Sequence, residues 1–156
     1  MTDDVRWLDD AQRNAWTAIA GLLVALPAEL DSEMQRRAGI TQFEYLVMAA
    51  LSEAPDRTLR ISTLARFAQG TLSRLSHLIK RLEKRGWLRR EPDPGDGRFT
   101  NAILTDAGYA KVVATAPGQV ELVRRLVVDV LTPAQLQRLG DTSRRILGAL
   151  HPGDGC

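Results

Sequence analysis

The segment Thr71–Arg85, TLSRLSHLIKRLEKR, carries the residues whose types and spacing could do the most specific chemistry. On a helical wheel its leucines and its isoleucine gather on one side, as expected of a face that packs against a core. The other side carries hydroxyl, imidazole and cationic groups, namely Ser73, His77, Lys80 and Lys84, with Arg74 and Arg81 on a flank. Arginine can donate two hydrogen bonds to guanine, and lysine binds phosphate. These side chains suit a helix that contacts DNA.

The residues before this helix complete a helix-turn-helix pattern. A short helix is expected over Thr63–Phe67, followed by a turn at Ala68–Gly70. In such motifs the second helix enters the major groove, with its N-terminal turns deepest. The residues expected to contact bases are therefore Thr71, Ser73, Arg74 and His77. Those expected to meet phosphate lie further along, at Lys80, Arg81 and Lys84.

Charge is distributed unevenly along the chain. The segment Arg57–Arg98 holds eleven Lys/Arg and four Asp/Glu, a net of +7, and the remainder of the chain carries a net of −5. Positive charge concentrated on one segment is the electrostatic footprint of a nucleic-acid-binding module. The alternative is a solvated basic surface that binds nothing.

The stretch Arg89–Thr100, RREPDPGDGRFT, interrupts this basic region with prolines and glycines. Short strands at Trp87–Arg90 and Ala102–Leu104 flank it, which predicts a β-hairpin. Near the tip, Arg98 could enter a narrow minor groove, where the negative potential is strongest, and Asp96 could orient it. The competing interpretation is an exposed turn with an ordinary surface ion pair, which contributes little.

Helices are expected on both sides of this central region. Apolar steps of three and four over Leu8–Leu30 predict a long helix, kinked near Pro27 and capped at Gly39. Thr41–Glu44 has capping-box spacing and opens a second helix that runs through Leu51. A short strand is expected at Arg60–Ser62.

The C-terminal part is expected to be helical as well. Thr105 can cap a helix that Pro117 and Gly118 break or bend, and Thr132–Gln135 has the pattern of a further helix start. The outer segments, Leu8–Leu30 and Val120–Leu150, leave apolar stripes with no evident partner in a small domain. They could pair within one chain, or with a second copy, which would supply the two-fold symmetry of a palindromic DNA site.

LIKRLEKRGWLRREPDPGDGRFTNAILTDAG, with the preceding LARFAQGTLSRL, closely resembles the winged helix-turn-helix core of the MarR family of bacterial transcription regulators. The resemblance covers about Thr41–Lys111, and its most specific part is the series RLEKRGW…RR…DPGDGR…LTDAG. It implies a homodimer on double-stranded DNA at a pseudo-palindromic operator, most often acting as a repressor. It also assigns Ser73 and Arg74 to the recognition helix, and Asp96 and Arg98 to the wing.

The resemblance implies a mostly α fold with a small β-hairpin wing. On this interpretation, residues 1–39 form an N-terminal dimerisation helix, 40–111 the DNA-binding domain, 112–151 the C-terminal dimerisation helices, and 152–156 a disordered tail. One departure stands out, because the family's wing often has two adjacent arginines after the aspartate. Here Gly97 replaces the first, so half of that cation pair is missing and a weakened or retuned minor-groove contact is expected.

Other classes of protein lack their signatures in this sequence. No apolar run approaches the roughly 18–20 residues of a membrane span, and the acidic start MTDD does not suit a signal peptide, so a cytoplasmic protein is expected. His77 and His151 are far apart, and Cys156 is the single cysteine, so no metal site is expected. Nucleotide-binding and nucleophile motifs are missing, so we expect neither an enzyme nor a cofactor.

Control by a ligand is the least constrained expectation. Relatives often bind small aromatic molecules between the helical dimerisation region and the winged helix, and Trp16, Phe43 and Tyr45 could line such a pocket. Core packing is the alternative role for these three. A peroxide-sensing mechanism is excluded, because it needs a reactive cysteine near the N-terminus. The alternative function is a winged-helix module that binds effectors or proteins without specific DNA recognition.

Overall fold

The computed structural model describes residues 5–67 and 72–150. The chain divides into two compact units, Met1–Pro117 and Gly118–Cys156. The expected turn at Ala68–Gly70, the candidate Thr71 and the expected tail at 152–156 lie outside the described residues. The division of the chain into dimerisation and DNA-binding segments stays a prediction.

The N-terminal helix α1 (Asp10–Ala38) begins at a capping box that was not predicted from the sequence, in which Asp9 accepts from the Gln12 backbone N–H at 2.8 Å. It ends at Gly39, whose φ of 66° is the left-handed conformation that favours glycine. The predicted cap at Gly39 is therefore confirmed. Pro27 lies inside α1 and does not end it, since the helix continues to Ala38.

Helix α2 (Gln42–Glu53) starts at the predicted capping box. The Glu44 backbone N–H donates to Thr41 Oγ1 at 3.0 Å, and the Thr41 backbone N–H donates to Glu44 Oε2 at 2.9 Å. Because both groups are satisfied locally, the start of α2 is fixed by four consecutive residues. The short helices η1 (Pro55–Arg57) and α3 (Ile61–Phe67) follow.

In the described part of the chain, three strands form an antiparallel sheet in the order β1-β3-β2. The predicted hairpin is confirmed as β2 (Leu88–Pro92) and β3 (Thr100–Leu104). The strand expected at Arg60–Ser62 is instead β1 (Thr58–Arg60), and Ile61 already belongs to α3. This strand is placed by pairing with β3, where Arg60 lies opposite Asn101, and no local pattern reveals that pairing.

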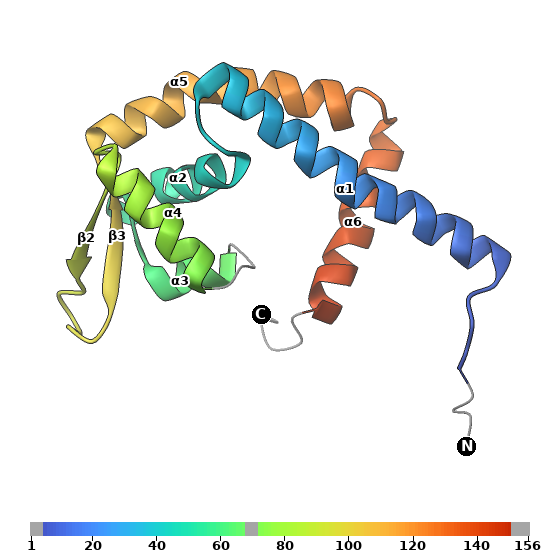
Figure 1. The fold of residues 1–156 in the computed structure, drawn as a ribbon, viewed down its shortest axis with the longest axis horizontal. Coiled ribbons are helices and arrows are strands. Elements are labelled where there is room, and N and C mark those ends of the chain that lie inside the picture. Colours follow the sequence, from blue (N-terminus) through green and yellow to red (C-terminus); the bar gives the residue numbers. More distant parts are fainter. Residues whose placement is uncertain (1–4, 68–71, 151–156) are drawn as a thin grey trace. The chain divides into compact units, whose positions relative to one another are not determined.

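Helix α4 (Leu72–Lys84) lies beside α3 and the hairpin in the first unit (Figure 1). Its apolar side is buried as the periodicity predicts, through Leu75, Leu78, Ile79 and Leu82. These side chains belong to a core that also contains Val47, Met48, Leu51 and Leu64. Gly86, with φ of 74°, follows the helix and redirects the chain into β2. The polar side of α4 is therefore held outward by burial of the opposite side.

Helix α5 (Asp106–Val123) begins after Thr105, whose Oγ1 accepts from the Gly108 backbone N–H at 3.1 Å. Pro117 does not break α5, contrary to one of the two predicted outcomes, because the helix continues to Val123. A π-helical turn, η2 (Arg124–Val128), and α6 (Pro133–Leu150) follow. Thr132 and Gln135 form the predicted cap of α6, with the Thr132 N–H donating to Gln135 Oε1 at 2.9 Å.

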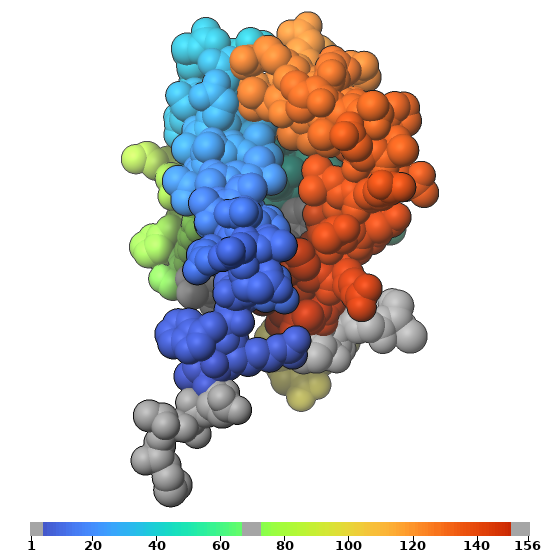
Figure 2. Space-filling model, turned by 90° about the vertical axis from the view of Figure 1, so that its right-hand side faces the viewer, coloured from blue at the N-terminus to red at the C-terminus, as the bar shows by residue number. Residues whose placement is uncertain are grey.

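The N-terminal half of α1, blue in Figure 2, faces solvent over much of its surface. Several of its large apolar side chains are exposed. Trp16 is 55% exposed and Val24 is 74% exposed, and Trp7 just before the helix is 84% exposed. The second unit also presents apolar residues to solvent, among them Val130, Ile146 and Leu150. Exposed apolar surfaces of this kind are typical of interfaces with another protein.

Candidate nucleic-acid interface

The outward side of α4 presents Ser73, His77, Lys80 and Lys84, all of which are exposed. Among the described residues, the structure gives Lys80 and Lys84 no ion-pair partner. A helix with an exposed hydroxyl, an imidazole and two uncompensated ammonium groups can donate hydrogen bonds to base edges and phosphates. These four predicted contacts therefore lie on one accessible surface.

The two arginines on the flank of α4 are turned toward α2. The guanidinium carbon of Arg74 lies 5.4 Å from the centroid of the Phe43 ring, a cation–π contact. Arg81 Nε donates to Glu44 Oε1 at 2.9 Å, and the Glu44 side chain is only 4% exposed. Arg81, a predicted phosphate contact, therefore also anchors α4 to α2. The sequence gives little indication of the contact between Arg81 and Glu44, because the capping box alone accounts for a glutamate at position 44.

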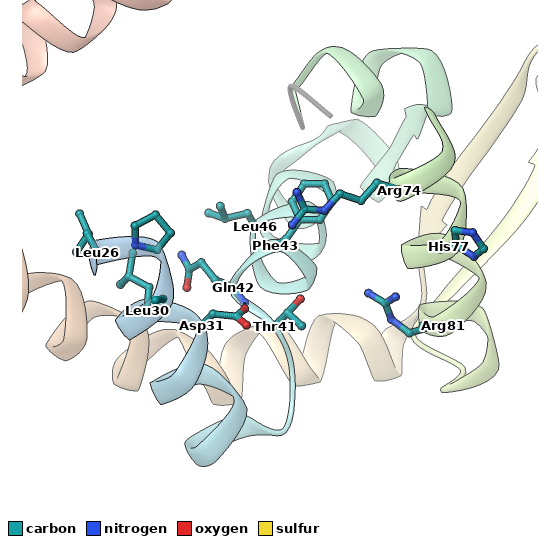
Figure 3. Close-up of a pocket in the computed structure, with 12 residues that line it drawn as sticks. Leu26, Leu30, Asp31, Thr41, Gln42, Phe43, Leu46, Arg74, His77 and Arg81 are labelled. Atoms are coloured by element: carbon teal, nitrogen blue, oxygen red, sulfur yellow. The ribbon is translucent and has the colours of Figure 1, made fainter. Parts of the chain in front are cut away.

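A groove of about 870 Å³ lies between α1, α2 and α4 (Figure 3). Phe43 and Leu46 form an apolar wall, and Arg74 reaches across from α4 toward the Phe43 ring. Within the described residues, the buried Oε1 of Gln42 has no hydrogen-bond partner in this groove. Of the three aromatic candidates for a ligand pocket, Phe43 lines the groove. Tyr45 is instead buried in the core, and Trp16 is exposed on α1.

The hairpin loop holds Asp96 and Arg98 together, as the sequence predicts. Arg98 Nη2 lies 2.7 Å from Asp96 Oδ2, and Arg98 Nε lies 3.0 Å from Asp96 Oδ1. This pairing holds the pKa of Asp96 below its ordinary value, chiefly through the hydrogen bond from the Arg98 side chain, and it raises the pKa of Arg98. The Arg98 side chain is nevertheless 86% exposed, so it is oriented and accessible at once.

A further carboxylate in this loop was not predicted from the sequence. Asp93 Oδ1 accepts from the backbone N–H groups of Gly95 at 2.8 Å and Asp96 at 3.1 Å, while Asp93 Oδ2 accepts from Arg60 Nε at 2.9 Å. The hydrogen bond from Arg60 is the main cause that lowers the pKa of Asp93. The available signal was Asp-Pro-Gly, in which an aspartate caps the turn that follows it.

The base of the hairpin is fixed to the helices by charged and aromatic contacts. Arg90 pairs with Glu83 at the end of α4, with Nε and Oε1 2.9 Å apart. The Trp87 ring lies near two cations, Arg85 at 4.9 Å and Lys111 at 5.4 Å. Arg85 also donates to the Gly39 carbonyl at 2.9 Å, at the C-terminal end of α1, where a positive charge is favourable. These contacts connect the base of the hairpin, which supports the wing, to α4, to α5 and to the end of α1.

Among the described residues, no group of three or more His, Cys, Asp or Glu side chains is placed to hold a metal ion. Within the same residues, no helix is both long and apolar enough to cross a membrane. The site therefore consists of an exposed polar helix and a hairpin whose loop presents the exposed Arg98. Helices α3 and α4 with this hairpin define a winged helix-turn-helix protein.

Comparison with known proteins agrees with this class. Residues 38–98 match the model of the MarR family. The regulator PecS of Dickeya dadantii is 43% identical over 61 residues, which cover 39% of this chain and 34% of PecS. The repressor MprA of Escherichia coli K12 is 22% identical over 122 residues, covering 78% of this chain and 69% of MprA. The matches to the first three curated relatives span between about a third and just over half of their lengths.

Two solved structures match over nearly the whole chain. Sco3205 of Streptomyces coelicolor, a MarR family regulator crystallised with DNA, is 42% identical, with 99% of this chain and 96% of Sco3205 covered and a TM-score of 0.92. AbsC from the same organism is 33% identical over 95% of this chain and 99% of AbsC, with a TM-score of 0.89. The chain therefore belongs to the MarR family. This is a family of DNA-binding transcription regulators, and not of enzymes.

Proposed function

We propose that this protein is a transcription regulator, acting as a repressor, that binds a pseudo-palindromic operator as a homodimer. One observation carries the proposal. The exposed polar side of α4 and the exposed Arg98, which Asp96 orients, belong to the same compact unit of the chain. The likeness to Sco3205 supports it, since that protein was crystallised with DNA. Family membership supports it further.

In this proposal α4 enters the major groove. Thr71, Ser73, Arg74 and His77 contact base edges, while Lys80, Arg81 and Lys84 meet phosphate. Arg98 enters the flanking minor groove, oriented by Asp96. Arg74 lies over the Phe43 ring in the structure, so a base would compete with that ring for the guanidinium.

The homodimer is supported by the apolar surface that each chain leaves uncovered. Leu22, Leu23 and Val24 of α1 are 46%, 62% and 74% exposed. Burial of apolar surface against a second copy stabilises association at about 25 cal/mol per Å². A two-fold pair of recognition helices would match an inverted repeat with half-sites about one helical turn apart.

The experiment is selection of bound sequences from a random duplex pool, followed by anisotropy titration of the selected duplex at two salt concentrations. An inverted repeat that is bound tightly and loses affinity steeply with salt supports the proposal, because several cation–phosphate contacts release counterions. Recovery of no motif, with only weak binding, would favour the alternative of a winged-helix module without specific recognition.

The groove between α1, α2 and α4 supports a regulatory ligand of small aromatic type. It offers the Phe43 ring for stacking and the Arg74 guanidinium for an acidic group. A ligand held by Arg74 would keep that side chain from DNA. The test is titration of the operator complex with benzoate, with Phe43→Ala as the variant. Release of DNA from the native protein, but not from the variant, is the expected result.

A further inference from the structure

We propose that Arg60 is a positioning residue for the wing, although it lies outside the hairpin. Together with Asp93 and Phe99 it forms a clasp that holds the loop 93–99 in the shape that presents Arg98 to DNA. The proposal rests on the proposed function, because it concerns how the wing reaches a minor groove. It adds a role for residues that make no predicted contact with DNA.

The first step of the argument is the carboxylate of Asp93, which uses both of its oxygens. Oδ1 accepts from the backbone of Gly95 and Asp96, and Oδ2 accepts from Arg60 Nε at 2.9 Å. The Asp93 side chain is only 12% exposed, whereas Arg98 is 86% exposed. Asp93 thus fixes the backbone of Asp96, the residue that holds Arg98.

The second step is the contact of Arg60 with the far end of the loop. Its guanidinium carbon lies 4.5 Å from the centroid of the Phe99 ring. The backbone closes the same loop, because the Asp93 N–H donates to the Phe99 carbonyl at 2.9 Å and the Phe99 N–H donates to the Asp96 carbonyl at 3.0 Å. One side chain therefore contacts both ends of the loop.

The third step is the position of Arg60 itself. It ends β1, where it lies opposite Asn101 in the ladder with β3, so the sheet sets its direction. Its charge is compensated by Asp93, unlike Lys80 and Lys84 on α4, for which the described residues provide no such partner. Arg60 is therefore arranged to hold the loop and not to meet phosphate.

The consequence concerns the entropy of binding. Gly95 and Gly97 give the loop many conformations when nothing restrains it. Ordering a flexible side chain on binding costs about 0.5–1.5 kcal/mol, and a loop that is already ordered avoids this cost. The clasp should therefore raise affinity where Arg98 makes its contact, and nowhere else.

The experiment measures the affinity of the full chain for the selected operator with A·T-rich or G·C-rich flanks. Arg60→Ala should weaken binding by about two- to tenfold on A·T-rich flanks, with little change on G·C-rich flanks. In the Arg98→Ala background, Arg60→Ala should have no further effect. Arg36→Ala is the matched control, because it removes an exposed arginine of α1 and leaves Glu33 paired with Arg37.

Two further variants separate the parts of the clasp. Asp93→Asn keeps an oxygen for the backbone of Gly95 and Asp96 but loses the charge that Arg60 pairs with, so its effect should be smaller than that of Asp93→Ala. Arg60→Lys keeps the charge and loses the planar contact with Phe99, so it should not restore the flank preference. Full recovery by Arg60→Lys on all DNA would identify Arg60 as a phosphate contact and overturn the proposal.

A readout without DNA separates this proposal from the proposed function. Backbone order parameters of residues 93–99 should fall in Arg60→Ala, while those of α4 and the melting temperature stay unchanged. Unchanged order in the loop would overturn the clasp, even in a protein that binds no operator. Equal losses on both flanks, or losses that add to those of Arg98→Ala, would overturn it as well.

Discussion

Helix α4 and the loop of the wing hold their arginines in opposite ways. On α4, Arg74 lies over Phe43 and Arg81 pairs with the buried Glu44, so both contact a neighbouring helix. In the wing, Arg98 pairs with Asp96 of its own loop and stays 86% exposed. Arg98 is therefore paired within its own loop and still exposed, whereas Arg74 and Arg81 of α4 are engaged with α2.

Because of this difference, changes in α2 and changes around the wing should affect DNA binding in different ways. A ligand or substitution that changes α2 can act on α4, because Arg74 and Arg81 already contact α2. The wing depends on its own loop, on β1, on its support at Trp87 and on the pair that Arg90 forms with Glu83. Substitutions on each side should therefore have distinct effects, of which the largest is expected at the support of the wing.

Gly108→Ala should remove the support of the wing. A Cβ at this position would lie 2.1 Å from the Trp87 carbonyl oxygen and 2.7 Å from Leu104 Cδ1, and backbone cannot move aside cheaply. We expect the free energy of unfolding to fall by about 3 kcal/mol, measured by denaturant unfolding. Gly118→Ala is the control, because an added Cβ there meets no atom within 4 Å. Equal stability of the two variants would contradict the expectation.

Arg74→Ala should weaken binding to the selected operator by about 1–3 kcal/mol and relax the base preference, if Arg74 reads a base. The loss on random DNA should be smaller, and anisotropy titration on both duplexes measures the difference. Equal losses on the two duplexes would reduce Arg74 to a phosphate contact. Arg74 would then contribute to the affinity of α4 for DNA but not to its base preference.

Glu44→Gln should release Arg81 while keeping the helix cap. Glutamine can still accept from the Thr41 N–H, but it offers no charge to Arg81, so we expect a loss of about 1 kcal/mol in unfolding free energy. The freed guanidinium should increase binding to random DNA, because Arg81 then reaches phosphate without first breaking an ion pair with a buried carboxylate. In an Arg81→Ala background the DNA effect should vanish. Its persistence there would rule out Arg81 as the cause.

Gly97→Arg should strengthen the wing by adding a second arginine beside Arg98. The position has no positive φ, and an added Cβ meets no atom within 4 Å, so the loop can accept the side chain. Affinity should rise by a few fold at low salt, with a salt slope steeper by about 0.9. Gly97→Gln controls for the change in size. An equal gain from glutamine would show that charge is not the reason.

The smallest effect concerns pH. The pKa values of Asp93 and Asp96 are lowered from 3.8, in each case mainly by an arginine side chain, so folding of the loop favours their charged forms. Their contribution is complete above the ordinary carboxyl value and is lost as pH falls through the lowered values. Order parameters of residues 93–99 should be constant down to about pH 5 and fall only under more acidic conditions. A loss of order near neutral pH would contradict this account.

Much of the fold was determined by short stretches of the sequence. The cap at Thr41–Glu44, the end of α1 at Gly39 and the two-sided pattern of α4 each depend on residues within a few positions of one another. The pair Asp96 and Arg98 is local as well, being two residues apart. Such contacts can be predicted because the backbone geometry that makes them is set nearby.

Only the tertiary structure decided which partners the other arginines take. Arg81 and Glu44 are 37 positions apart, and Arg60 and Asp93 are 33 apart. With 21 Lys/Arg and 19 Asp/Glu in the chain, charge alone allows many pairings. Packing of α4 on α2 and pairing of β1 with β3 select among them, because a salt bridge forms only where folding has already brought two side chains within reach.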